Sequence, residues 1–192
     1  MLDVARSGGN ALLVAPTGAG KTLAGFLASL ADLIESPAEG LHTLYVSPLK
    51  ALAVDVRRNL LSPIEEMGLD IRVETRTGDT PSDRKARQRV RPPQILLTTP
   101  ESLGLLLSYP DSFQMFAKLR TVIIDEVHAF APHKRGDLLS LSLARLQAIN
   151  PALYRIALSA TVADPVPIAN GSRPAAWPEQ CAWSKAIRVR HL

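Results

Sequence analysis

The sequence predicts an α/β fold in which helices cover both faces of a parallel β-sheet. Short apolar runs alternate with helical patterns up to residue 160, and this alternation is typical of β-α-β units. The polar clusters PTGAGKT, SPLK, TTPE, DEVH and SAT each follow a run directly. Because ligands of such sheets bind beyond the carboxyl ends of the strands, we expect the functional residues at one edge.

Six apolar runs are predicted to be strands, and helical patterns separate most of them. The strands are expected over 11–15, 43–48, 71–78, 94–99, 121–125 and 154–160. The helices are expected over 21–36, 51–68, 100–108 and 137–149. In the first helix, Leu23, Phe26, Leu27, Leu30 and Ile34 share one helical face, which predicts the face that packs on the sheet.

The last part of the sequence differs from the rest. From Pro165 onward it holds four prolines and shows no sustained periodicity. We therefore expect a domain over 1–165 and a poorly ordered or loosely docked tail over 166–192. Trp177 and Trp183 in this tail could stack on bases or pack on a partner.

Composition excludes several classes of protein. Hydrophobic residues make up 46% and charged residues 21%, which is ordinary for a globular domain. A net charge of +4 favours a polyanionic partner. The single cysteine, Cys181, rules out an internal disulfide and shows no metal-ligand spacing. No apolar run approaches the roughly 20 residues that cross a bilayer, and the N-terminus lacks a signal-peptide layout, so we expect a cytoplasmic protein without membrane contact.

A phosphate-binding loop is predicted at APTGAGKT, residues 15–22. The pattern G-x-x-x-x-G-K-[ST] is met except that Ala15 replaces the first glycine. In such a loop the backbone of Gly18, Ala19 and Gly20 cradles phosphates, and the following helix adds its positive N-terminal end. Lys21 then reaches the β- and γ-phosphates, and the Thr22 hydroxyl binds Mg²⁺. The alternative is a glycine-rich turn of no special function.

Two adjacent acids follow the strand at 121–125. Asp125 is placed to hold Mg²⁺, and Glu126 is placed to orient and deprotonate an attacking water. The alternative is that the pair only caps the following loop. The phosphate loop in the same chain favours the ATP-hydrolysis interpretation.

DEVH, together with APTGAGKT and LSAT, resembles the superfamily 2 DExH-box helicases, over roughly residues 2–165. SPLKAL (47–52), TGD (77–79) and TTPESL (98–103) resemble the family's nucleic-acid motifs, in the family's order. The residues of these motifs are most similar to those of the large-helicase-related group, and within it to those of DNA-ligase-associated enzymes. This resemblance implies a RecA-like P-loop NTPase fold and a DNA helicase that uses ATP and Mg²⁺.

The resemblance also implies roles for particular residues. His128 would couple the nucleotide site to Ser159 and Thr161, although a lone histidine is often structural. The nucleic-acid track would be lined by Ser47, Pro48, Lys50, Thr77, Gly78, Thr99 and Glu101. Its partner would be single-stranded DNA, with RNA as an alternative, and a DNA ligase or nuclease would be a protein partner.

Two departures from the family affect the expected activity. The adenine-recognition glutamine and the second RecA-like domain, which supplies arginine fingers, are expected to be missing. The sequence alone therefore leaves two functions open: a motor domain that cannot unwind by itself, and a nucleotide- and nucleic-acid-binding module without turnover. A small-molecule kinase is the third alternative, and the nucleic-acid motifs argue against it.

A basic run, RKARQRVR at 84–91, allows two interpretations. Its five basic residues are accompanied by no acid, so they could contact phosphates. They could equally form the solvated face of a helix. The sequence does not separate these alternatives.

Overall fold

The computed structural model describes residues 10–15, 20–130, 134–159 and 185–188, the last four as backbone. Its centre is one sheet with the strand order β3-β4-β2-β5-β6-β1-β7, in which every neighbouring pair is parallel. The strands are β1 (Ala11–Val14), β2 (Thr43–Val46), β3 (Val73–Arg76), β4 (Ile95–Thr98), β5 (Thr121–Ile124), β6 (Tyr154–Ser159) and β7 (Lys185–Arg188). The predicted parallel α/β fold is confirmed.

Helices make most of the crossovers that parallel strands require. They are α2 (Lys21–Glu35), α3 (Lys50–Glu66), α4 (Ser82–Val90), α5 (Pro100–Ser108), α6 (Ser112–Phe116) and α7 (Lys134–Ile149), with a short 3₁₀ turn η1 (Val127–Ala129). The four predicted helices are all present. Helix α4 contains most of the basic run, and α6 was not predicted.

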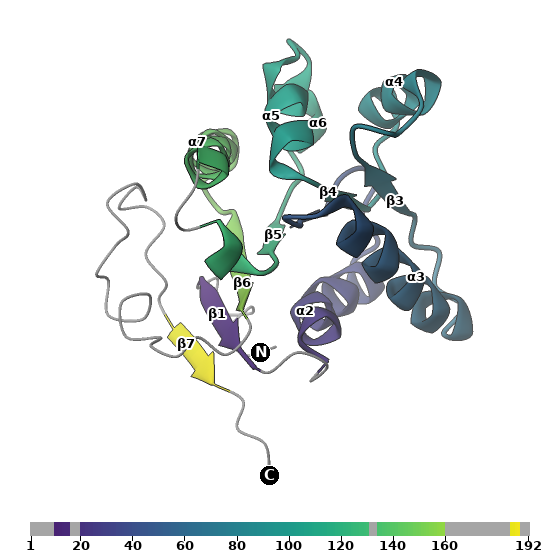
Figure 1. Ribbon diagram of the computed structural model, residues 1–192. Coiled ribbons are helices and arrows are strands. Elements are labelled where there is room, and N and C mark those ends of the chain that lie inside the picture. Colours follow the sequence, from purple (N-terminus) through teal and green to yellow (C-terminus); the bar gives the residue numbers. More distant parts are fainter. Residues whose placement is uncertain (1–9, 16–19, 131–133, 160–184, 189–192) are drawn as a thin grey trace.

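The strands alternate their side chains between two apolar cores, one on each face of the sheet. Leu12 and Val14 of β1 face the core formed with α5, α6 and α7, whereas Leu13 faces the core formed with α2 and α3. Figure 1 shows the same division, with α2 and α3 on one side of the sheet and α5 to α7 on the other. Both faces are covered, so the sheet leaves its carboxyl edge as the open surface for a site.

The predicted buried face of α2 is partly wrong. Phe26 and Leu30 are buried as expected, but Leu23, Leu27 and Ile34 are 44, 45 and 50% exposed. The face on the sheet is completed by small residues such as Gly25, where an added Cβ would lie 3.2 Å from a methyl carbon of Leu158. The close approach of helix and sheet depends on these small residues, which a search for large apolar residues overlooks.

Strand β7 lies in the tail, where we predicted no strand. It pairs in parallel with β1, with Ala11 opposite Lys185 and Val14 opposite Arg188. An edge strand presents unpaired N–H and C=O groups, and β7 gives those of β1 backbone partners. The division into 1–165 and 166–192 stays a prediction, and Trp177, Cys181 and Trp183 lie outside the described residues.

Candidate functional site

The carboxyl ends of the central strands lie side by side and bring the polar clusters together. Val46 is aligned with Thr98 on one side and with Ile124 on the other. The Ser47 amide donates to the Thr98 carbonyl at 3.0 Å, and the Asp125 amide donates to the Val46 carbonyl at 2.9 Å. Residues that are distant in the sequence therefore form one polar edge.

The start of α2 forms the end of this edge that is predicted to bind phosphate. Gly20, the N-cap, has φ 69° and ψ 17°, a left-handed conformation that glycine adopts without steric cost. The first turn of α2 contains no acidic residue, so the positive end of the helix remains available to an anion. Gly18 and Ala19 of the predicted loop lie outside the described residues.

Lys21 and Thr22 stand at the first turn of α2. The Lys21 side chain is buried, and its Nζ donates to the Ala15 carbonyl at 2.7 Å. The ammonium is thus held at the end of β1, where the predicted phosphate loop begins. Thr22 lines a cavity together with Lys21, Asp125 and Glu126.

Asp125 is a buried carboxylate with both oxygens in hydrogen bonds. Oδ1 accepts from the Glu126 amide at 2.9 Å, and Oδ2 accepts from the Tyr45 hydroxyl. Burial raises the pKa of Asp125; the Tyr45 hydrogen bond opposes this rise, and the Glu126 charge adds to it. A buried carboxylate whose negative charge is only partly stabilised in this way favours a nearby cation.

These residues fit Mg²⁺ bound together with a nucleotide. Thr22 and Asp125 supply oxygen donors to the same cavity, and Mg²⁺ prefers oxygen. In the described ranges, His, Cys, Asp and Glu side chains do not gather in threes as a metal site of their own.

Glu126 has a strained backbone. Its φ of 45° and ψ of 49° are left-handed, and it is the one non-glycine residue with positive φ in the described part of the chain. Such conformations cost about 1–3 kcal/mol and cluster at functional sites. The left-handed conformation of Glu126 turns the chain from β5 into η1 directly after Asp125, so the two adjacent acidic side chains do not crowd each other.

His128 joins the DEVH segment to the end of β6. Its Nδ1 lies 3.0 Å from Ser159 Oγ and 3.3 Å from Glu126 Oε2. The three side chains come from the ends of neighbouring strands, as the predicted coupling requires. The coupling role itself stays a prediction, and Thr161 lies outside the described residues.

The cavity beside these groups has a volume of about 380 Å³. Besides the predicted residues, it is lined by side chains of α2 and α3: Leu23, Phe26, Leu52, Asp55, Val56, Asn59 and Leu60. Sequence analysis did not identify the α3 side of this cavity. The exposed Leu23 is explained here, because it lines the cavity instead of the core.

The predicted nucleic-acid residues lie along the ends of β2, β3 and β4. Ser47, Thr77 and Thr99 are buried, so they shape the backbone more than they offer side chains. Lys50 and Gly78 are exposed; Lys50 Nζ lies 2.9 Å from Asp79 Oδ1, and the Gly78 carbonyl accepts from Lys85 at 2.8 Å. These positions form a row along the ends of three neighbouring strands, β3, β4 and β2.

Arg135, which sequence analysis missed, donates hydrogen bonds to Pro48 and Glu101, the remaining predicted nucleic-acid residues. Its Nη2 donates to the Pro48 carbonyl at 2.7 Å, and its Nε donates to Glu101 Oε1 at 2.5 Å. Although burial opposes it, the Arg135 hydrogen bond helps to hold the pKa of Glu101 below its ordinary value. Gly136 permits this placement, because an added Cβ there would lie 2.2 Å from the Phe130 carbonyl oxygen. An arginine–glycine pair at a helix start was the available signal.

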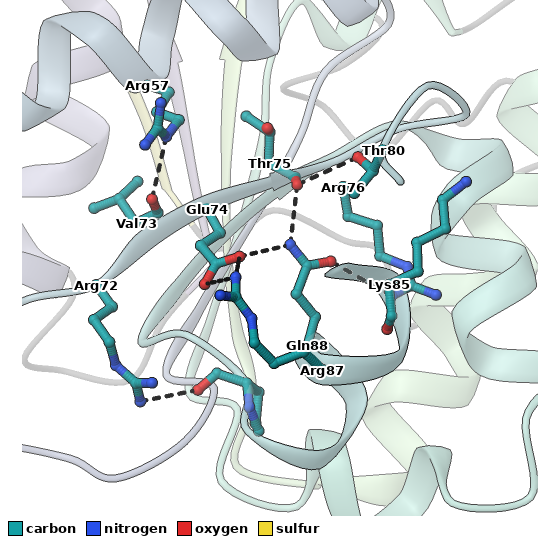
Figure 2. Close-up of polar contacts among 11 residues, drawn as sticks. Arg57, Arg72, Val73, Glu74, Thr75, Arg76, Thr80, Lys85, Arg87 and Gln88 are labelled. Atoms are coloured by element: carbon teal, nitrogen blue, oxygen red, sulfur yellow. Dashed lines mark hydrogen bonds and ion pairs between the residues drawn. The ribbon is translucent and has the colours of Figure 1, made fainter. Parts of the chain in front are cut away.

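Much of the basic run is used inside the domain. Arg87 pairs with Glu74 of β3 at 2.8 Å, and Lys85 reaches the Gly78 carbonyl. Gln88 also binds Glu74, at 2.9 Å, so α4 is fastened along the edge strand, as Figure 2 shows.

The other basic residues of the run differ in their contacts and exposure. Arg89 pairs with Asp111 at 2.7 Å and stacks over the Tyr109 ring at 3.9 Å. Arg84 and Arg91 are exposed. The run therefore lies on a largely exposed helix, as the solvated-face interpretation expected, and Lys85, Arg87 and Arg89 also make contacts within the domain.

Comparison with known proteins places this site in a family. The model of the DEAD/DEAH box helicase family matches residues 1–167. The chain belongs to the DEAD/DEAH box helicase family and is a RecA-like helicase domain. Among the described residues, no helix has the length and apolar character needed to cross a membrane.

Helicases named Lhr are among the most similar relatives. The chain is 49% identical to the Lhr helicase/probable uracil glycosylase of Mycolicibacterium smegmatis over 176 residues, which are 84% of this chain and 12% of the relative. It is 47% identical over 170 residues to the ATP-dependent helicase Lhr-Core protein 2 of Thermococcus barophilus, covering 81% and 20% of the two chains. The chain thus spans a fifth or less of the length of these relatives.

The solved structure of Mycobacterium smegmatis helicase Lhr bound to ssDNA and AMP-PNP has the same fold. The TM-score is 0.82 and the identity 42%, and the match covers 98% of this chain and 25% of the other.

Proposed function

We propose that this domain is the first motor domain of an ATP-dependent DNA helicase. It binds ATP with Mg²⁺, and the bound nucleotide changes how tightly the domain binds single-stranded DNA. One observation carries the proposal: His128 lies within reach of both Glu126 and Ser159, on the edge that also holds Lys21 and Asp125. A change at the nucleotide end therefore has a side-chain route to the end of β6.

Each residue at the nucleotide end has a chemical role in this proposal. Lys21 and the N-terminus of α2 bind phosphate oxygens. Thr22 and Asp125 hold Mg²⁺, which would neutralise phosphate charge. Glu126 orients the attacking water and accepts its proton.

The nucleic-acid side is supported by position and by the relatives. The row from Pro48 to Glu101 runs along the strand ends, and a relative of 42% identity has been solved with ssDNA. RNA binding is an outcome to be tested in parallel. A DNA-ligase-associated subtype and a ligase or nuclease partner stay predictions that rest on the sequence resemblance.

Nucleotide binding can be tested with a fluorescent, slowly hydrolysed ATP analogue. Lys21→Ala should weaken binding about 10- to 100-fold, because a charge-assisted hydrogen bond contributes roughly 1.5–3 kcal/mol. Lys118→Ala is the matched control, since Lys118 is exposed and lies before the amino end of β5. Equal affinity of the Lys21 variant and wild type would refute the nucleotide site.

Coupling requires a second measurement. The affinity of the domain for a fluorescent single-stranded DNA should change when the ATP analogue is added, and the change should be lost in His128→Ala. An analogue that binds without altering DNA affinity in the wild type would contradict the coupling and leave a binding module.

A further inference from the structure

A tyrosine in the sheet contacts the proposed metal-binding carboxylate, and the sequence motifs assign it no role. Tyr45 is fully buried in the central strand β2, between Leu44 and Val46. Its neighbouring strands are β4 and β5. A buried hydroxyl costs free energy unless it is hydrogen-bonded, so an aliphatic residue would be the simpler choice if this position served only the core.

The Tyr45 hydroxyl finds its partner at the functional edge. It donates to Asp125 Oδ2, while Asp125 Oδ1 accepts from the Glu126 amide at 2.9 Å. Two donors on opposite oxygens fix the plane of the carboxylate. Each oxygen retains a further lone pair, and these remain for a metal ion or its bound water.

The Tyr45 ring also contacts the helix that follows the phosphate loop. It stacks on Phe26 with ring centroids 5.4 Å apart and an interplanar angle of 26°. Phe26 follows Thr22 by four residues on α2, which places the two side chains on one helical face. One side chain thus contacts the Asp125 carboxylate at its hydroxyl and the Thr22 face of α2 at its ring.

We propose that Tyr45 is a positioning residue for the magnesium–nucleotide site: its hydroxyl fixes the Asp125 carboxylate, and its ring sets the distance to the Thr22 side of α2. This inference rests on the proposed function. Groups that orient a metal ligand in this way typically contribute 10- to 100-fold to metal affinity.

The test compares nucleotide binding with and without Mg²⁺. Tyr45→Phe keeps the ring and its stack on Phe26 and removes only the hydroxyl oxygen. Affinity for the ATP analogue should fall about tenfold at fixed Mg²⁺ and remain unchanged in excess EDTA. Phe26→Leu is the complementary control, because it removes the stack and leaves the hydroxyl. Its Mg²⁺-dependent loss should be smaller than that of Tyr45→Phe.

A double variant distinguishes a positioning role of Tyr45 from general structural support. In Asp125→Asn, where the metal ligand is already removed, adding Tyr45→Phe should leave the remaining, Mg²⁺-independent affinity for the ATP analogue unchanged, and a further loss would show a structural role. If Tyr45→Phe does not fold, Tyr45→Leu removes the hydroxyl and the ring together, so its Mg²⁺-specific loss should be at least as large.

Two results would overturn the inference while leaving the proposed function intact. One is a Tyr45→Phe protein whose Mg²⁺ dependence equals that of wild type. The other is an equal loss with Mg²⁺ and in EDTA, which would show a structural role alone. A wild-type domain that binds no nucleotide under either condition would refute the proposed function, and this inference with it.

Discussion

Replacing Arg135 by alanine tests whether the nucleic-acid row is held from α7. The change removes the 2.7 Å bond to the Pro48 carbonyl and the pair with Glu101. The Glu101 pair is about half exposed on both sides and contributes about 0.5 kcal/mol. The partly buried, charge-assisted bond to the carbonyl contributes about 1.5 kcal/mol.

The expected loss in the free energy of unfolding is therefore about 2 kcal/mol. For a domain of this size each kcal/mol moves Tm by roughly 2–4 °C, so Tm should fall by about 4–8 °C. Arg145→Ala is the matched control: Arg145 is an exposed arginine on the same helix, and its loss should stay within about 0.5 kcal/mol.

Binding of single-stranded DNA should weaken in Arg135→Ala, because Pro48 and Glu101 lose their fixed separation. If Arg135 acts only by position, the log–log dependence of affinity on salt keeps its slope. If it contacts a phosphate directly, the slope falls by about 0.7. A variant with wild-type Tm and wild-type DNA affinity would refute the reasoning.

Further predictions concern the buried charges and the basic run. Asp125→Asn should raise Tm at neutral pH and abolish Mg²⁺-dependent nucleotide binding; because burial raises the pKa of Asp125, the Tm gain should shrink as pH falls and the wild-type carboxyl protonates. Replacing Arg87 and Arg89 together by alanine should lower Tm in a thermal melt and leave the salt slope of DNA binding unchanged, and a decrease of about 0.7 per residue would instead show phosphate contacts. Burial lowers the pKa of His42 below 6.5, so its contribution to stability is complete above that pH and is lost as pH falls below it. Urea unfolding at several pH values should show this loss in wild type and a weaker one in His42→Asn.

Local sequence was sufficient for the nucleotide end of the site. Asp125 and Glu126 follow β5 directly, Lys21 and Thr22 begin the helix that follows β1, and in a parallel sheet every strand end lies at the same edge. The fold class, the order of the motifs and the meeting of these residues could be predicted for this reason. Spacing along the chain already determines which edge a residue occupies.

Helix packing was less predictable. On α2 the exposed leucines, Leu23 and Leu27, look like core residues, whereas the actual contact with the sheet depends on small residues such as Gly25. Hydropathy records how apolar a side chain is, and it does not record how closely two backbones approach.

Long-range polar contacts were decided by the tertiary structure alone. Tyr45 and Asp125 are 80 positions apart, and Arg135 and Pro48 are 87 apart. Such pairs meet only after strand order and register are set, because a shift of one residue would turn Tyr45 to the other face of the sheet. The sequence by itself determined which residues meet at the proposed nucleotide site, and the folded sheet determined which side chains hold them in place.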